Sequence, residues 1–461
     1  MAGISNNSSI LSMLKVWYKD GVENLMFRNS PALQKINKVR VEGKSQNFNA
    51  LYGHGGAGSS DYTKALTNAS TVAKDVEFAV TPGQLFSVYT MNAKEVQASV
   101  TQRGAYMKVA GAKMFAASET FRKMMAAAFY GRGYGEICAS GHTTAIVANT
   151  AFDLSLPDSA IMKIDVDTQL ALKSSVTSTT VNTVLTVNSI NGNTVNVTPT
   201  LAVASPLATD ILCYYGSMDA SGNPIMPMGL GGWLPTVASR TGTNWTTYIG
   251  TTFFGVNRSI VADRLAGAFY KAASTSETYL TSVKNLMKKC RRQGSLADLI
   301  IVNDSDFATL DTELTTNNTY FTATSTKAKK NATSGFSEIA AAFSTNFVDN
   351  IVDDPYCPQG RFYVLDSKTV EFWSYTNVDK LNDGIANNNP GKEDPMAMEN
   401  EGKEKQAYGL IIDDYLNVQS GTATVDGPST NVTLQCFGSF VVTNPSVNGV
   451  GEFANSTDFE L

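Results

Sequence analysis

Residues 101–130 read TQRGAYMKVAGAKMFAASETFRKMMAAAFY and carry the strongest helical pattern of the chain. Large apolar residues fall mostly on one broad stripe and most charged residues fall elsewhere, as in a helix that packs one face on a core. Alanine favours the helix intrinsically, and Gly131 and Gly133 end it. The pattern predicts a rod of about 30 residues and roughly 45 Å. The methionines of the stripe are also typical of an adaptable binding surface, but core packing is the preferred interpretation.

Before this helix, the sequence predicts an extended β arm. The segment LQKINKVRVEGKSQNFNALYG at 33–53 alternates apolar and polar residues, and strand character returns on both sides of a Pro82-Gly83 turn. The glycine-rich stretch GHGGAGSSD at 53–61 is expected to be a flexible tip. A phosphate-binding loop is disfavoured there because the required Lys-Ser/Thr and strand–helix context are missing. An isolated ribbon is marginally stable, so the arm needs a partner surface.

The start of the chain predicts a short amphipathic helix over residues 9–29, which ends before Pro31. The first 21 residues, MAGISNNSSILSMLKVWYKDG, lack the basic and apolar regions of a signal peptide. Because no run of ~20 apolar residues occurs, we expect no transmembrane helix.

After the long helix, residues 150–235 predict a small inserted β-barrel or sandwich rich in Val and Thr. Asn191-Gly192 is a strong hairpin signal, and Asp219 to Gly222 indicates another turn. Asp165 and Asp167 are expected on one strand face. A metal or acid–base pair is one interpretation of these two acids, and a solvated strand face is the preferred one.

A second amphipathic helix is predicted at 275–293, with Thr275 or Ser276 as its cap and an acid in its first turn. Its last turn carries a basic cluster that suits the helix dipole. DNA or a carboxylate of a neighbour is the alternative partner of that cluster. The cluster consists of Lys288, Lys289, Arg291 and Arg292.

The remainder of the chain predicts a β-rich end. ADLIIVND at 297–304 is expected to be a buried strand that leads into a turn at SDFATL, and further strands are expected at 348–352, 362–365 and 366–375. The polar stretch 380–406 is expected to be an exposed loop. FGSFVVTNPS at 437–446 is expected to belong to a late strand.

Composition argues against a dedicated nucleic-acid binder. The net charge is −5, whereas phosphate neutralisation requires a basic protein. Only 17% of the residues are charged, which suits surfaces that become buried against neighbours.

No catalytic, cofactor-binding or metal-binding residue is assigned, and we expect no enzymatic activity and no cofactor. The two histidines, His54 and His142, support neither a catalytic triad nor a His-rich metal site. A carboxylate mechanism remains open as an alternative, with Asp353, Asp354, Asp413 and Asp414 as candidates. The five cysteines are interpreted as free thiols because no pair is spaced C-x-x-C. They are Cys138, Cys213, Cys290, Cys357 and Cys436.

The order of these parts resembles the major capsid proteins of tailed bacteriophages with the Hong Kong 97-like fold, including the crAss-like group. The resemblance rests on the N-terminal helix before FRNSPALQKI, the glycine-tipped arm, the long helix, GVNRSIVADR at 255–264, and DPYCPQGRFYVLDSKTVEFW at 354–373. It implies an α+β fold with a long spine helix, an extended hairpin arm (the E-loop), an axial domain and an inserted β-rich domain.

The domains expected from this resemblance are an N-terminal arm and helix at 1–43, the β-arm and the start of the peripheral domain at 44–100, and the spine helix at 101–149. The inserted domain is expected at 150–235, and the axial domain with the remaining peripheral strands at 236–461. Some relatives cross-link through a Lys and an Asn; Lys64 lies near the arm tip, but no cross-linking site is assigned.

The resemblance also implies a function. The chain would assemble with itself, as hexamers and pentamers, into the icosahedral head that encloses double-stranded DNA. Portal, scaffold and auxiliary or decoration proteins would be further partners, packaged DNA would make only weak non-specific contacts, and no membrane would be involved. The protein would be assembled in the cytoplasm of a bacterial host and reside in the virion. The alternative is a β-rich glycan-binding or glycan-hydrolysing protein that is secreted or attached to a virion.

Overall fold

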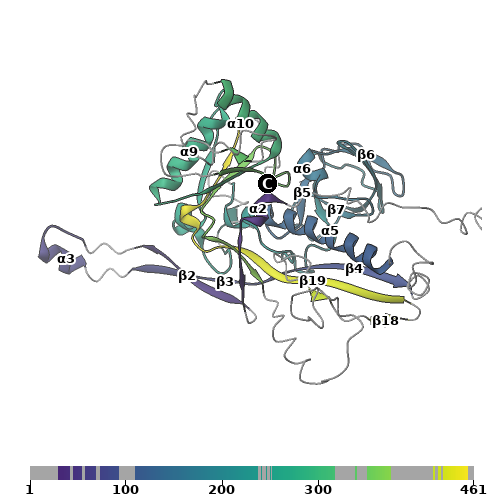
Figure 1. Ribbon diagram of the computed structural model, residues 1–461, viewed down its shortest axis with the longest axis horizontal. Helices are drawn as coiled ribbons and strands as arrows, with labels where there is room; N and C mark the ends of the chain where they lie inside the picture. Colours follow the sequence, from purple (N-terminus) through teal and green to yellow (C-terminus); the bar gives the residue numbers. More distant parts are fainter. Residues whose placement is uncertain are drawn as a thin grey trace, which may run out of the picture.

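The computed structural model describes residues 30–41, 45–53, 58–68, 73–92, 109–236, 240, 245–246, 250, 252–316, 338–339, 350–374, 419–420, 424–426 and 429–454. Over these residues the chain forms three six-stranded sheets and a two-stranded hairpin, and the hairpin extends away from the rest of the molecule (Figure 1). Helices and strands are segregated, so the predicted α+β class is confirmed.

The first sheet, called the main sheet, lies beneath the long helix α5, Val109–Tyr130 (Figure 1). Its centre is β19, which pairs antiparallel with β4 and β16. Helix and sheet meet through Phe129 and Phe440, whose ring centroids are 5.0 Å apart. The predicted helix at 101–130 is therefore confirmed from residue 109 onward. The strands are β1 (Asn37–Arg40), β4 (Gly83–Asn92), β16 (Val370–Ser374), β17 (Gln419–Ser420), β18 (Thr424–Asp426) and β19 (Ser429–Val442).

The second sheet, called the top sheet, is covered on one face by α9 (Tyr279–Arg292) and α10 (Asp304–Thr316). Its other face packs against the end of α5, where the ring centroids of Tyr363 and Tyr130 are 5.7 Å apart. The strand order is β11 (Ala268–Lys271), β20 (Gly449–Glu452), β15 (Arg361–Leu365), β12 (Leu299–Val302), β14 (Asn350–Asp353) and β13 (Glu338–Ile339).

Two predictions for this layer were wrong in detail. SDFATL belongs to α10 rather than to a turn, because the Asn303 side chain accepts the N–H of Ser305 at 3.0 Å and so starts a helix. The cap of α9 is Thr278, which accepts the N–H of Thr281 at 3.2 Å. Glu277 therefore lies outside the helix, and it accepts the N–H of Ala273 at 2.9 Å instead.

The third sheet, called the insertion sheet, is antiparallel throughout and contains the predicted hairpin at Asn191-Gly192. It reaches upstream of residue 150, because β5 pairs with β10. Asp165 and Asp167 do not share a strand face. They lie in the connection before β7, and Asp167 has a positive φ of 66°. The strand order is β5 (Glu136–Ala139), β10 (Ile211–Tyr214), β7 (Gln169–Lys173), β8 (Thr183–Asn191), β9 (Thr194–Pro199) and β6 (Phe152–Ser155).

The arm is a hairpin of β2 (Gln46–Gly53) and β3 (Lys74–Val80), with the short helix α3 (Tyr62–Asn68) at its far end (Figure 1). After Pro82 the chain leaves the hairpin, and β4 pairs with β19 in the main sheet. The arm thus closes at Val80, whereas the expected segment 44–100 also contains the first long strand of the body.

The remaining short elements connect the sheets. They are α2 (Pro31–Gln34), α6 (Asp158–Ile161), α7 (Leu230–Trp233), α8 (Ala262–Leu265) and the 3₁₀ turns Arg258–Ile260 and Pro445–Val447. The predicted helix at 9–29, the predicted loop at 380–406, His54, Asp413 and Asp414 lie outside the described residues.

Candidate functional site

The base of the arm is built into the hydrophobic core. Phe78 on β3 is fully buried, and Phe48 on β2 stacks on it with ring centroids 5.2 Å apart. Phe48 also meets Trp233 of α7 at 6.1 Å and Trp373 of β16 at 5.8 Å. These aromatic contacts fix the first residues of the hairpin to the body.

The loop around residues 252–264 anchors the arm from a second side. The N–H of Ala79 donates to the carbonyl of Phe254 at 3.1 Å, and a guanidinium N–H of Arg264 donates to the carbonyl of Tyr52 at 2.6 Å. Within this segment Arg258 is fully buried, and its guanidinium group donates to the carbonyls of Gly232 and Trp233. Burial, together with the positive charge of Arg240, lowers the pKa of Arg258 well below its usual value.

Beyond this anchorage, the far part of the arm presents apolar side chains to solvent. Leu51 is 57% exposed, Tyr62 80% and Leu66 61%. No residue of α3 is buried, and so short a helix is not stable through its own hydrogen bonds. Tyr62 and Leu66 are one turn apart and share a face. The far arm is therefore a surface that gains stability when another surface covers it.

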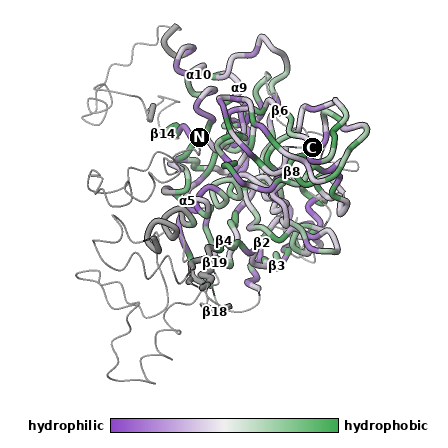
Figure 2. The backbone as a smooth tube through the Cα atoms, turned by 90° about the vertical axis from the view of Figure 1, so that its right-hand side faces the viewer, coloured by the Kyte–Doolittle hydropathy of each residue, from purple (hydrophilic) through white to green (hydrophobic). Residues whose placement is uncertain are grey.

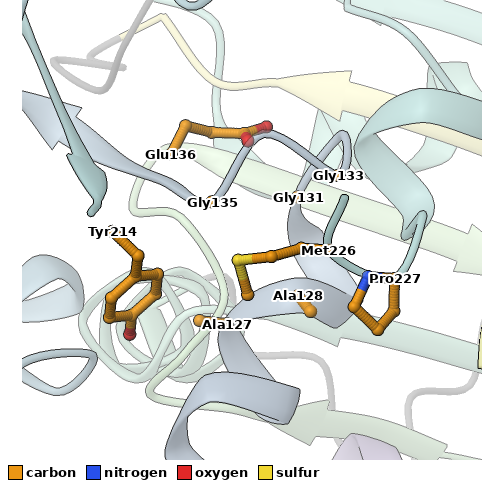
Figure 3. Close-up of a pocket in the computed structure, with 9 residues that line it drawn as sticks. All are labelled: Ala127, Ala128, Gly131, Gly133, Gly135, Glu136, Tyr214, Met226 and Pro227. Atoms are coloured by element: carbon orange, nitrogen blue, oxygen red, sulfur yellow. The ribbon is translucent and has the colours of Figure 1, made fainter. Parts of the chain in front are cut away.

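The insertion sheet joins the body through a tightly packed glycine junction (Figure 3). Gly133 and Gly135 have φ values of 84° and 67°, and a Cβ on Gly135 would lie 2.7 Å from the sulfur of Met226. Figure 3 shows these glycines beside Met226 and Pro227, at the end of α5. The gap between them leaves no room for a water molecule, so it is a packing interface rather than a ligand site.

A wider cleft of about 320 Å³ lies between α5 and the insertion sheet. In it, the ammonium group of buried Lys123 lies 2.7 Å from the carboxylate of Asp165. The cleft contains no histidine or cysteine. The ion pair accounts for Asp165 as a structural residue. Asp167 also lines the cleft, but no group of three or more potential metal ligands forms among the described residues.

Asp354, a carboxylate candidate, is fully buried where the N-terminal segment crosses the top sheet. It accepts a hydrogen bond from the Ser30 hydroxyl and one from the N–H of Tyr356 at 2.9 Å. Burial raises its pKa, and these hydrogen bonds oppose that rise. The geometry fastens the segment from Ser30 to the body and leaves no space for a substrate. Asp353 lies beside it in β14.

The other candidates have structural surroundings. All five cysteines are buried and free, and burial raises the pKa of Cys213, Cys290 and Cys436 to about 12, which keeps these thiols protonated and unreactive. The His142 ring packs against Phe152 in a tilted arrangement, with ring centroids 4.6 Å apart. Lys64 is exposed on α3. Asp61 caps α3 by accepting the N–H of Thr63 at 2.9 Å.

Across the described ranges, no group of His, Cys, Asp and Glu has the arrangement of a metal site, and no helix has both the length and the apolar character needed to cross a membrane.

The sequence interpretation missed the anchorage of the arm. Phe254 and Arg264 lie in or next to the segment GVNRSIVADR, but their partners, Ala79 and Tyr52, are far away in the sequence. No local spacing signals such a contact.

Comparison with solved structures identifies the class of the fold. The chain is similar to the subunit in "Cyanophage A-1(L) capsid asymmetric unit", with a TM-score of 0.57, 12% identity, and coverage of 98% of this chain and 100% of that chain. The chain therefore has the fold of a phage capsid protein, and the resemblance to the Hong Kong 97-like fold is confirmed at the level of the fold.

Two further structures match over similar lengths. "Capsid of native GTA particle" matches with a TM-score of 0.46, 7% identity and coverage of 98% and 100%. The SrpI encapsulin from Synechococcus elongatus matches with a TM-score of 0.44, 7% identity and coverage of 98% and 97%. No protein-family model and no curated protein matches the chain. The glycan-binding or glycan-hydrolysing alternative receives no support from these comparisons.

Proposed function

We propose that this protein is a major capsid protein that assembles with copies of itself into the icosahedral head of a tailed bacteriophage. It has no enzymatic role. The observation that carries the proposal is the arm, whose base is locked into the core by Phe48 and Phe78 while Tyr62 and Leu66 at its far end are exposed. A stiffly mounted arm with an uncovered apolar end fits a subunit that reaches across a neighbour.

In this proposal α5 is the spine helix of a peripheral domain that contains the main sheet. The β2–β3 hairpin with α3 is the E-loop, the top sheet with α9 and α10 is the axial domain, and the insertion sheet is an inserted domain. The similarity of fold to the cyanophage A-1(L) capsid subunit supports this assignment.

Copies of the chain meet as hexamers and pentamers through repeated contacts, each of moderate strength, which together give avidity. Portal, scaffold and decoration proteins are the further partners, and the packaged double-stranded DNA makes weak non-specific contacts with the shell. A chain with a net charge of −5 suits a container that does not grip its cargo. Assembly takes place in the cytoplasm of a bacterial host, and the product is the virion shell.

The test compares the assembly of Leu66→Ser with that of Lys64→Ser. Both residues are exposed on α3, and Lys64 lies about 160° around the helix from Leu66. Purified chains are examined by sedimentation and negative-stain electron microscopy. We expect capsomers or shells from the unchanged protein and from Lys64→Ser, and a shift toward unassembled subunits for Leu66→Ser. If the unchanged protein stays a monomer at every concentration, alone and with a scaffold, the proposal is wrong.

A further inference from the structure

The two helices over the top sheet carry charges of opposite sign. The charged residues of α9 are all basic, and those of α10 are all acidic. Hydrophilic residues recur along both helices in the side view of Figure 2. The basic residues are Lys284, Lys288, Lys289, Arg291 and Arg292, and the acidic residues are Asp304, Asp306, Asp311 and Glu313.

α9 packs along β11, which is the edge strand of the top sheet. Lys289 donates to the carbonyl of Phe269 in β11 at 2.7 Å, and Asn285 donates to the hydroxyl of Tyr270 at 2.9 Å. Lys288 and Arg292 are exposed on the outer side of this helix, four residues apart. Neither forms an ion pair with any residue of the described ranges. These two residues are called the basic edge.

α10 lies on the other side of α9, and its acids are divided between two flanks. Glu313 faces α9, because its carboxylate accepts the N–H groups of Tyr279 and Leu280, each at 2.9 Å. Asp304 and Asp311 lie about 180° and about 160° around the helix from Glu313, and Asp304 is exposed. These two residues, called the acidic edge, are therefore on the flank that faces away from α9.

We propose that the basic edge of one copy binds the acidic edge of the next copy. This inference rests on the proposed function, since it names the surfaces through which copies of the chain meet. Because the two edges lie on opposite flanks of one layer, the contact joins unlike surfaces head to tail. Such a contact gives a ring when the rotation between successive copies adds up to a full turn.

The electrostatics fit a repeated contact rather than a single strong one. An exposed ion pair contributes little by itself, but every copy in a ring makes the contact twice, once with each edge, so the effects add across the ring. Opposite charges also select the correct orientation of neighbouring copies and repel like edges.

DNA is the other class of partner for a basic helix surface, and the same layer argues against it. A nucleic-acid surface extends one sign of charge over many residues, whereas here the neighbouring helix is acidic and the chain as a whole is acidic.

The experiment uses charge reversal in the full chain. The first variant is Lys288→Glu with Arg292→Glu, the second is Asp304→Lys with Asp311→Lys, and the third combines all four changes. Lys368→Glu is the control, because Lys368 is exposed in the turn between β15 and β16. Assembly is followed by sedimentation against protein concentration, and the folding of the unassembled chain by circular dichroism.

Each one-sided reversal places like charges against each other, so we expect the concentration needed for assembly to rise roughly tenfold. The combined variant restores opposite charges, and its assembly should return to within about threefold of the unchanged protein. The effect of the one-sided reversals should change with salt, since exposed charges are screened.

The outcomes separate the two proposals. If the unchanged protein assembles and both one-sided variants assemble as well as it does, the edges do not meet and this inference is wrong. If only the basic-edge reversal has an effect and that effect is loss of binding to double-stranded DNA in a mobility-shift assay, the edge binds DNA instead. A combined variant that is folded but does not recover also overturns the inference. Failure of the unchanged protein to assemble contradicts the proposed function itself.

Discussion

The ammonium group of Lys123 in α5 lies 2.7 Å from the carboxylate of Asp165 in the inserted region, and this contact joins the long helix to the insertion sheet. Lys123 is buried, whereas Asp165 is partly exposed. Within the inserted region, the Tyr214 hydroxyl of β10 donates to the carbonyl of Lys163, which ties the segment before Asp165 to the insertion sheet. The ion pair and the glycine junction at Gly133 and Gly135 together fix the insertion to the helix.

Replacing Asp165 with Asn should lower the free energy of unfolding by about 1 to 2 kcal/mol, because the change removes the charged partner of a buried ammonium group. Urea unfolding followed by circular dichroism measures the change. Asp167→Asn is the matched control. Asp167 is exposed with a φ of 66°, and Asn tolerates that backbone conformation, so its effect should be within about 0.5 kcal/mol. Equal losses in the two variants would contradict the role of the ion pair.

Replacing Glu313 with Ala should destabilise the layer of α9 and α10 by about 1 to 2 kcal/mol. The carboxylate accepts the N–H groups of Tyr279 and Leu280 at the start of α9, where both the free N–H groups and the helix dipole favour a negative charge. Thermal unfolding is the measurement. Thr309→Ala, an exposed change on the same helix, is the control and should leave the melting temperature nearly unchanged. An unchanged melting temperature for Glu313→Ala would show that the cap is dispensable.

Asp354 should make the stability of the protein depend on pH. Its pKa in the folded protein is raised, with burial as the largest cause, so the folded state binds this proton more tightly than the unfolded state does. The contribution of Asp354 to the free energy of unfolding therefore decreases as the pH rises from its pKa in the unfolded state through its raised pKa in the folded state. The decrease is at most about 1.4 kcal/mol per pH unit.

The measurement for Asp354 is urea unfolding at several pH values between mildly acidic and neutral. We expect Asp354→Asn to remove this part of the pH dependence, so that the difference between the variant and the unchanged protein varies with pH. A difference that is constant over the whole range would contradict the shift. The variant Ser30→Ala removes the hydroxyl that donates to Asp354 but leaves the titrating carboxyl group in place. It should therefore keep the pH dependence.

Replacing Arg264 with Ala should loosen the arm and leave the core intact. The guanidinium group holds the carbonyl of Tyr52 at 2.6 Å, but it is exposed, so global stability should change by less than about 1 kcal/mol. Amide hydrogen exchange should accelerate in β2 and β3, since local opening needs little free energy there. The buried strand β12 serves as the internal reference and should exchange at its original rate. Exchange in β2 and β3 at the original rate would exclude this anchor.

The amino-acid sequence by itself determined the elements whose signals are local. The apolar stripe at 101–130 predicted α5, Asn191-Gly192 predicted the turn between β8 and β9, and two short apolar runs predicted strands β12 and β15. These features follow from side-chain period and turn chemistry, which act over a few residues. The order of the elements was enough to indicate a capsid fold.

Only the tertiary structure decided which distant residues meet. SDFATL forms a helix because the Asn303 side chain accepts the N–H of Ser305 at its start, and because Phe307 and Leu310 pack into the core of the top sheet. Asp165 forms an ion pair with Lys123 and does not share a strand face with Asp167, and Arg264 donates a hydrogen bond to the carbonyl of Tyr52, which is distant in the sequence. Such contacts depend on how the sheets are stacked, and a long-range contact leaves no periodic trace in the sequence. The placement of the charges on the opposite flanks of α9 and α10 is of the same kind, since the packing of each helix determines which of its faces remains exposed.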